Sequence, residues 1–398
     1  MRNNPYIAKR AINEASLRKA NVPFLSRFDI ELTERCNNNC IHCCINLSAD
    51  NVNAREKELS TGRIKIILKE AASLGCLRVR FTGGEPLLRE DFEELYIFAR
   101  KLGLKVLIFS NATLLTPHLA ELFSRILPLE KIEITLYGMK KSSYEAITRV
   151  NGSFAAAWRG ISLLLDHKIP FVVKGALLPG NKDEIKEFEK WAGTIPWADK
   201  SPPYSMFFDL RCRRDKGKNR SIKNLRLSPE EGLKFLTRSK DKYVKEMKEF
   251  CSKFMRLSGD KLFTCGSGSD GGCVDAYGYF YPCMMLKHPD TGYDLKKGSL
   301  KDALTGFFPK LREIRSTNPE YLKRCAKCFL KGLCEQCPAK SWIEHGNLDT
   351  PVEYLCEIAH VQARFLALVK DDEMAWEVKD WGGRIKKFTR GCNHGTKS

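Results

Sequence analysis

Phe28-Asp-Ile-Glu-Leu-Thr33, an apolar strand-like run, is followed after two residues by Cys36-Asn-Asn-Asn-Cys40-Ile-His-Cys43. Iron–sulfur clusters of the four-iron type are held by cysteine thiolates, normally four of them. Three thiolates within eight residues therefore predict a cluster in which one iron has no protein ligand. An iron left open in this way can bind and break a small molecule, whereas a closed cluster carries electrons or holds the fold.

A zinc knuckle is the alternative for the same cysteines, and it requires a fourth nearby ligand in tetrahedral geometry. His42 is the nearest candidate, but it is crowded between Cys40 and Cys43. The neighbouring Cys44 does not easily share the loop geometry of the other three. The spacing therefore favours the open cluster over zinc.

Six strand-like runs recur along the first half of the chain, separated by helix-length segments. The runs are Phe28–Thr33, Leu77–Phe81, Val106–Ser110, Ile132–Tyr137, Phe171–Leu178 and Tyr204–Leu210. Segments such as Asp91–Leu102 between them carry helical apolar spacing. This alternation predicts a parallel sheet, and six units predict an α/β fold, a partial (β/α)6 TIM barrel open on one side. Parallel barrels carry their chemistry on the loops after the strands, which is where the cysteine loop lies.

A second candidate segment, Gly83-Gly84-Glu85-Pro86, follows the second strand-like run. Two glycines allow a backbone to approach a ligand closely, and a carboxylate beside them can receive the positive amino group of an amino acid. An ordinary strand-to-helix turn would explain the segment equally well if it stood alone. Its place beside the cysteine loop favours the ligand-binding interpretation.

The composition sets the broad class. The chain has 398 residues, 43% of them hydrophobic, which is enough for two or three domains with packed cores. It contains no run of 18 apolar residues, so we expect no spanning helix and no membrane partner. The first residues are polar and basic without an apolar segment, which argues against a secretory signal and favours a cytoplasmic protein.

The formal net charge of +19 favours acidic partners without naming one. Its densest stretch, Arg211 to Arg226, holds eight basic residues and one acid, Asp215. A solvated loop is the ordinary explanation, and a docking surface for an anionic substrate is the alternative. Nucleic acid is disfavoured because no aromatic residue is interleaved. The sixteen cysteines point to metal ligation, since a cytosolic compartment keeps thiols reduced.

The cysteine loop after the first strand, together with GGEP after the second, resembles the signature of the radical S-adenosylmethionine (SAM) superfamily. The resemblance implies that the open iron of a 4Fe-4S cluster on Cys36, Cys40 and Cys43 chelates the amino and carboxylate groups of SAM. It further implies reductive cleavage of the sulfonium bond, and hydrogen abstraction from a substrate by the 5′-deoxyadenosyl radical. A reductant such as flavodoxin or ferredoxin is the implied partner.

The same resemblance assigns further cofactor contacts. They are Gly83, Gly84, Glu85, Pro86, Ser110, Asn111, Thr135 and Arg149. The glycine segment matches the part that holds the SAM amino group, and Thr135 matches a position where a hydroxyl often meets the ribose. Arg149 fits a SAM-carboxylate arginine, with a surface residue as the alternative. For Asn111, the alternative is a cap on the following turn.

A second group of cysteines lies in the C-terminal part. Cys265 and Cys283 form a C-x12-G-x4-C pattern, and the others follow as C-x2-C-x5-C-x2-C and a final cysteine: Cys325, Cys328, Cys334, Cys337 and Cys356. This arrangement resembles a SPASM extension, the module of auxiliary clusters in peptide-modifying radical SAM enzymes. The family run ends in C-x3-C, one residue longer than here.

The SPASM resemblance implies two auxiliary 4Fe-4S clusters. The first would use Cys265, Cys283 and Cys337, with Cys273 as fourth ligand, and would have an open iron if Cys273 does not bind. The second would use Cys325, Cys328, Cys334 and Cys356. A zinc ribbon on Cys325–Cys337 is the alternative that spacing alone allows.

The remaining cysteines are expected to have other roles. We expect Cys76 and Cys251 to be buried as small hydrophobes. Cys212 follows the sixth strand-like run, where a hydrogen-atom donor would face the barrel mouth. Cys44 and Cys392 receive no role.

The expected organisation has five parts: an N-terminal extension over 1–27, the radical SAM partial barrel over 28–226, a helical bridge over 227–264, the SPASM domain over 265–370 and a basic C-terminal tail over 371–398. Ser228, Pro229 and Glu231 mark a helix start with a capping box. The stretch from Pro351 to Lys370 is expected to be helical, and the tail after Trp381 mobile.

Modification of a peptide or protein side chain is the leading functional hypothesis. Formylglycine formation of the anaerobic sulfatase-maturase type is an alternative, but Met284 stands where those enzymes carry a proposed acidic base. A tetrapyrrole or another small molecule is a third candidate, because haem-pathway enzymes share the extension. A non-catalytic iron–sulfur or zinc scaffold is disfavoured, since a carrier has no reason to keep a cofactor cleft.

Overall fold

The computed structural model describes residues 25–43, 45, 47–199, 202–205 and 216–390. The chain forms two compact units. The first comprises 1–226 with 266–311, and the second comprises 227–265 with 312–398. This division differs from the expected domains, because 266–311 packs with the barrel and not with the remaining cysteine-rich segments.

A nine-stranded sheet forms the first unit, in the order β11-β10-β9-β1-β4-β5-β6-β7-β8. The barrel strands are β1 (Arg27–Thr33), β4 (Arg78–Gly83), β5 (Lys105–Ser110), β6 (Leu129–Thr135), β7 (Phe171–Ala176) and β8 (Tyr204–Ser205). All neighbouring pairs from β1 to β8 are parallel. The predicted partial barrel is confirmed, and five of its strands agree with the predicted runs. Of the sixth run, Tyr204–Ser205 forms β8, and residues 206–210 lie outside the described residues.

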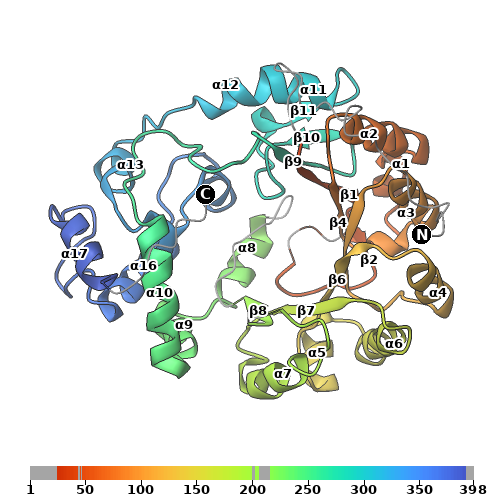
Figure 1. Ribbon diagram of the computed structural model, residues 1–398, viewed down its shortest axis with the longest axis horizontal. Helices are drawn as coiled ribbons and strands as arrows, with labels where there is room; N and C mark the ends of the chain where they lie inside the picture. Colours follow the sequence, from red (N-terminus) through yellow and green to blue (C-terminus); the bar gives the residue numbers. More distant parts are fainter. Residues whose placement is uncertain (1–24, 44, 46, 200–201, 206–215, 391–398) are drawn as a thin grey trace. The chain divides into compact units, whose positions relative to one another are not determined.

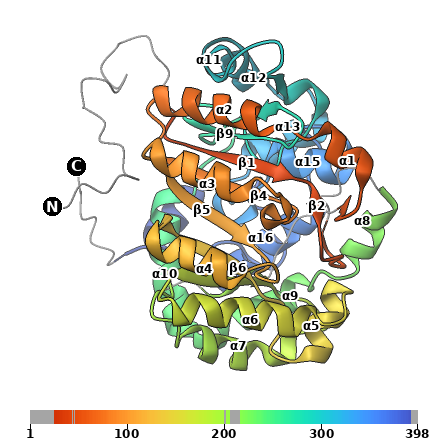
Figure 2. The same cartoon turned by 90° about the vertical axis from the view of Figure 1, so that its right-hand side faces the viewer.

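Helices line the outer side of these strands (Figure 1). They are α1 (Val52–Lys57), α2 (Thr61–Ser73), α3 (Phe92–Lys101), α4 (Pro117–Arg125), α5 (Lys141–Thr148), α6 (Ser153–Asp166) and α7 (Ile185–Ala192). In the turned view, α2, α3, α4 and α6 form one layer over the sheet (Figure 2). The sheet residues that face this layer, such as Phe28, Ile30 and Phe81, are buried and form the core.

A hairpin that the sequence pattern did not predict extends the sheet beyond β1. It consists of β9 (Gly271–Val274) and β10 (Tyr279–Tyr281), followed by β11 (Tyr293–Asp294). β9 runs parallel to β1, with Arg27 opposite Gly271. Gly272 is required there, because a Cβ atom would stand 2.6 Å from the Tyr281 carbonyl oxygen. The hairpin covers the open edge of β1, which would otherwise expose unpaired backbone groups.

The second unit is helical. Its principal helices are α9 (Pro229–Leu236), α10 (Lys240–Phe254), α13 (Pro319–Lys323), α14 (Lys331–Cys334), α15 (Pro338–His345), α16 (Glu353–Phe365) and α17 (Trp381–Phe388). The predicted capping box of Ser228 and Glu231 is confirmed. Helix α16 lies within the stretch predicted to be helical. Among the described residues, no helix is both long and apolar enough to cross a membrane.

As far as residue 390, helix α17 corrects the prediction of a mobile tail after Trp381, and residues 391–398 lie outside the described residues. Trp381, Ile385 and Phe388 recur at helical spacing and pack on the hydrophobic core of this unit. The Trp381 ring stacks on Phe329, with 5.8 Å between ring centroids. The basic residues Lys386 and Lys387 fall in the last turn, where positive charge favours a helix.

Candidate cofactor and metal site

The cysteine loop is held against the glycine segment by backbone contacts. Gly84 N–H donates to the Thr33 carbonyl at 2.8 Å, and Glu85 N–H donates to the Arg35 carbonyl at 2.9 Å. A Cβ atom on Gly84 would stand 2.2 Å from the Arg35 carbonyl oxygen. The glycines therefore allow close approach of the chain's own backbone, where the sequence had indicated close approach of a ligand.

The side chain of Arg35, next to Cys36, anchors the start of the loop. Arg35 Nε donates to Glu58 Oε1 at 2.8 Å, and both side chains are nearly buried. Arg35 Nη1 donates to the Ala49 carbonyl at 2.9 Å. The fixed guanidinium limits the freedom of the adjacent Cys36.

Helix α5 anchors the middle of the loop. Asn39 N–H donates to the Thr148 carbonyl and Ile41 N–H donates to the Ile147 carbonyl, both at 2.9 Å. The contacts occupy carbonyl groups at the C-terminal end of the helix, which would otherwise lack partners. Cys40, between the two donors, is held in the same way.

The three thiols expected to hold a cluster lie close enough to influence one another. Cys40 is 7% exposed, and Cys36 and Cys43 are half-buried. Burial, followed by the neighbouring Glu85 charge, raises the pKa of Cys36 to about 12. Burial and the other two cysteines raise the pKa of Cys40 further. Since metals bind the thiolate, a positive centre would stabilise three anionic sulfurs that otherwise repel one another.

Glu85 is a buried carboxylate committed to the protein itself. It is 0% exposed. Its Oε1 accepts from Ser110 Oγ at 3.0 Å and its Oε2 accepts from Asn111 N–H at 2.7 Å. Burial raises its pKa to about 7. In this structure the carboxylate is committed to partners within the protein, and the segment's backbone borders the cysteine loop. A contact of Glu85 to a cofactor stays a prediction.

Asn111 links the strand ends to the cysteines. Its Nδ2 donates to Cys36 Sγ at 3.7 Å and to Asn37 Oδ1 at 2.9 Å. Its Oδ1 also accepts from Thr113 N–H at 2.9 Å, so the capping alternative is confirmed beside the contact to the cysteine loop. Asn37 and Thr113, joined at 2.7 Å, belong to this network and were missed. The polar Asn37-Asn38-Asn39 run between two cysteines was the available signal.

The other predicted cofactor contacts lie along the loops of the same strands. Thr135 is the last residue of β6 and is half-buried. Arg149 is exposed and caps α5 with a left-handed backbone, at φ 55°. Pro86 begins a short 3-10 helix (Pro86–Leu88). Their contacts to a cofactor stay predictions.

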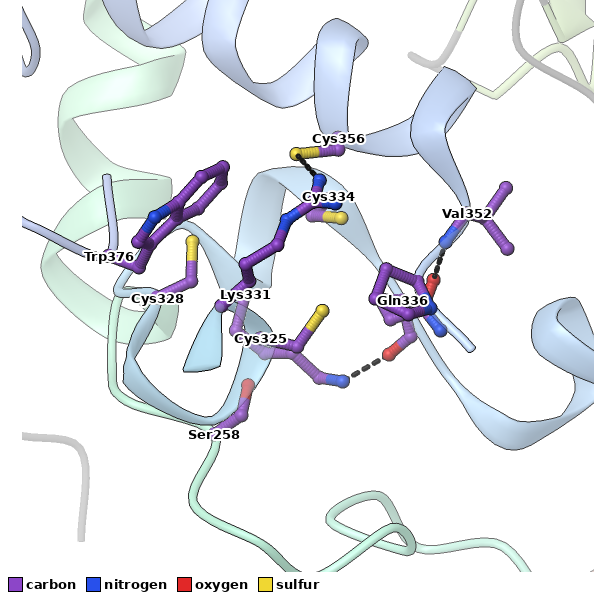
Figure 3. A pocket seen from close by; sticks show the side chains of 11 residues that line it. Ser258, Cys325, Cys328, Lys331, Cys334, Gln336, Val352, Cys356 and Trp376 are labelled. Carbon is purple, nitrogen blue, oxygen red and sulfur yellow. Dashed lines mark hydrogen bonds between the residues drawn. The ribbon is translucent and has the colours of Figure 1, made fainter. Parts of the chain in front are cut away.

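Four of the C-terminal cysteines line a single cavity in the second unit (Figure 3). They are Cys325, Cys328, Cys334 and Cys356. The cavity between these side chains is small, with a volume of about 20 Å³. Within the described ranges, no three His, Cys, Asp or Glu side chains form a group suited to one metal ion. Burial raises the pKa of Cys325 to about 11 and that of Cys328 to about 12, so thiolates here also require a positive partner.

The ligands expected for the first auxiliary cluster are divided between the units. Cys273 and Cys283 belong to the first unit, and Cys265 and Cys337 to the second. Cys273 pairs with Tyr281 across the hairpin, which brings it to the same end as Cys283. Cys273 is fully buried, and its Sγ lies 3.6 Å from Lys287 Nζ. The shared cluster stays a prediction.

The other cysteines follow their expected roles where the structure describes them. Cys76 and Cys251 are 0% and 1% exposed, which confirms their predicted burial. Cys44, Cys212 and Cys392 lie outside the described residues. Of the basic stretch, Lys216–Lys223 forms helix α8, and 211–215 lie outside the described residues.

Residues 30–192 match the family model of the radical SAM superfamily. The fold and the cysteine loop therefore define the class of this part of the chain, which is a radical SAM domain. The resemblance that the two sequence motifs indicated is confirmed.

Relatives give a more detailed comparison. The AdoMet-dependent heme synthase of Methanosarcina barkeri is 26% identical over 339 residues, covering 80% of this chain and 92% of the relative. The solved structure of native anSMEcpe with bound AdoMet has a TM-score of 0.59 at 16% identity, covering 86% and 96%. SuiB of Streptococcus suis bound to S-adenosylmethionine has a TM-score of 0.57 at 16% identity, covering 84% and 77%. The two structures show a shared fold.

Proposed function

We propose that this radical SAM enzyme holds its catalytic 4Fe-4S cluster on Cys36, Cys40 and Cys43 and acts by hydrogen abstraction from a substrate. The observation that carries the proposal is the anchoring of the three-cysteine loop between the glycine segment and α5. Such a cluster, when bound, supplies the electron that cleaves SAM to the 5′-deoxyadenosyl radical. The protein's task is to position and shield the cofactor.

The chain's own residues would divide that task. Arg35 would anchor the backbone next to Cys36, and Asn111 would orient the Cys36 sulfur. The backbone of Gly83 to Glu85 borders the position of the SAM amino group. Thr135 would meet the ribose, and Arg149 the SAM carboxylate. Neither contact is needed to hold the cluster, so their loss should weaken SAM binding while iron is retained.

We also propose two auxiliary 4Fe-4S clusters on the cysteines predicted for them. The support for the second cluster is that Cys325, Cys328, Cys334 and Cys356 line one cavity. The support for the first cluster is partial, since the pairing of β9 with β10 brings Cys273 and Cys283 to the same end of the hairpin. Three clusters would contribute about 12 irons per chain, carried by cysteine thiolates.

A tetrapyrrole is the substrate class that we place first. The support is the similarity to the heme synthase, which spans 80% of this chain. Modification of a peptide side chain, the leading hypothesis from the sequence, is the second candidate. Its support is the fold shared with SuiB. The net charge of +19 suits carboxylate-bearing substrates of either class.

The test is anaerobic purification, reconstitution and iron counting, followed by reduction with dithionite in the presence of SAM. We expect 5′-deoxyadenosine as a product. An iron porphyrin with propionate side chains and a short acidic peptide containing Cys and Ser are then compared by mass spectrometry. A change in mass of the porphyrin, with the peptide unchanged, supports a tetrapyrrole as the substrate class. Absence of 5′-deoxyadenosine from fully loaded protein would exclude radical catalysis.

A further inference from the structure

The guanidinium of Arg324 is fixed beside the four-cysteine cavity. Its two terminal nitrogens donate to the two carboxylate oxygens of Glu353, each at 2.7 Å. Its Cζ lies 4.9 Å from the ring centroid of Trp376, within the range of a cation–π contact. A bidentate pair adds geometric specificity to its strength. The arginine head group therefore has a defined direction.

The arginine head group points to Cys356, a proposed cluster ligand. Arg324 Nη2 also donates to Cys356 Sγ at 3.7 Å, and both residues line the cavity. Glu353 and Cys356 are three residues apart on α16, a spacing that places them on one face of the helix. The carboxylate thus holds the arginine on the side where the sulfur lies.

His360 fixes Cys356 from the following turn of α16. Its Nε2 accepts the Ala375 N–H at 3.1 Å. A ring nitrogen that accepts has no proton in the neutral ring, so Nδ1 is the donor toward the Cys356 carbonyl at 2.8 Å. The His360 ring also makes an edge contact with Trp376, at 5.5 Å between ring centroids. One tryptophan therefore supports both partners of Cys356.

The charge around the cavity is one-sided. Arg324 and Lys331 line it, and its described lining includes no Asp or Glu. Lys331 is held by a hydrogen bond from its ammonium to the Gln336 carbonyl. Glu353, which is paired with Arg324, and Glu357 are the acids that act on Cys356. An added electron in this cavity would meet the cationic groups of Arg324 and Lys331.

We propose that Arg324 is a positioning residue that raises the reduction potential of the cluster on Cys325, Cys328, Cys334 and Cys356. The inference rests on the proposed function, which supplies that cluster. Reduction adds negative charge to the sulfurs. An N–H donor and a cation at Cys356 stabilise the reduced state more than the oxidised state, and hydrogen bonds to sulfur are among the determinants of cluster potential.

The test is a redox titration followed by electron paramagnetic resonance, in full-length protein that carries C36A, C40A and C43A. In this background, R324M should lower the midpoint potential of one auxiliary cluster. Loss of one hydrogen bond to a charged group corresponds to a reduced-to-oxidised ratio about tenfold lower at a fixed potential. R324K, which keeps the charge but loses the planar fork, should give a smaller shift.

K327M is the matched control. Lys327 lies in the same short turn, is exposed, and does not line the cavity. K327M removes one positive charge, as R324M does, but we expect its midpoint potential to match that of the parent. Equal shifts in R324M and K327M, or no shift in R324M, would overturn the role of Arg324.

Two further variants keep the outcome decisive. If R324M does not retain iron, R324Q is measured instead, because it removes the cation and keeps a polar side chain that can donate to Glu353. A lowered midpoint in R324Q supports the role, and an unchanged or raised one overturns it. If C325A/C328A binds as much iron as its parent, the cluster itself is absent, and the proposed function fails together with this inference. Full iron content with an unshifted midpoint overturns the inference alone.

Discussion

The backbone N–H of Asn111 donates a 2.7 Å hydrogen bond to the buried carboxylate of Glu85. This bond ties the end of β5 to the end of β4, and the Asn111 side chain continues the connection to Cys36 Sγ. The Glu85 carboxylate therefore helps to position the cysteine loop indirectly, through Asn111. Its burial also makes it sensitive to pH.

Replacing Glu85 with Gln should change the pH dependence of stability. The pKa of Glu85 is raised to about 7 in the folded protein, from an ordinary value of 4.5. The folded state then holds its proton more tightly than the unfolded state. The free energy of unfolding should fall between about pH 4.5 and pH 7, by about 3 kcal/mol from this group.

Urea unfolding of metal-free E85Q and parent protein at pH 5 and pH 8 measures this effect. The parent should lose more stability than E85Q between the two pH values. E121Q, a change at an exposed helix carboxylate, is the control and should behave like the parent. Equal pH dependence in parent and E85Q would contradict the assignment.

Gly84→Ala should disrupt the cysteine loop. The new Cβ would stand 2.2 Å from the Arg35 carbonyl oxygen, which is backbone and cannot rotate away. Overpacking of this kind costs about 1–3 kcal/mol. We expect lower affinity for iron at the N-terminal site and weaker SAM cleavage.

Gly62→Ala provides the control for that change. Gly62 lies in α2 with open space where a Cβ atom would stand, so iron content and SAM cleavage should match the parent. The measurements are iron per chain and the rate of 5′-deoxyadenosine formation. A fully active G84A protein would show that the close backbone approach is dispensable.

The triple variant C36A/C40A/C43A should abolish SAM cleavage. About 8 of about 12 irons should remain, because the auxiliary clusters use other cysteines. Iron analysis and electron paramagnetic resonance check the expected residual clusters. Persistent formation of 5′-deoxyadenosine would place the radical chemistry at another site.

Cys273→Ala should remove about four irons per chain if all four predicted thiolates hold the first auxiliary cluster. Cys76→Ala is the matched control, because Cys76 is also 0% exposed in the same unit and has no proposed ligand role. We expect full iron content in C76A. Full iron content in C273A as well would restrict Cys273 to its contact with Lys287.

The barrel was predictable from the sequence because its signals are local. The alternation of strands and helices and the spacing of Cys36, Cys40 and Cys43 require no knowledge of distant contacts. The pairing of Arg27 with Gly271 joins residues 244 positions apart, and no local pattern reports such a contact. The inward direction of the Glu85 carboxylate likewise depends on Ser110, the last residue of β5, and on Asn111, which follows it.

Helix α17 is a further element whose role depends on packing, and Trp381→Ala tests it. The residues around it are basic, which concealed the apolar stripe of Trp381, Ile385 and Phe388. Because the Trp381 ring stacks on Phe329 and is only partly buried, its loss should lower the free energy of unfolding by about 2 kcal/mol. Lys387→Ala, on the exposed side of the helix, should change it by less than about 0.5 kcal/mol. Equal stabilities of W381A and K387A, measured by urea unfolding, would show that α17 does not contribute to the core of this unit.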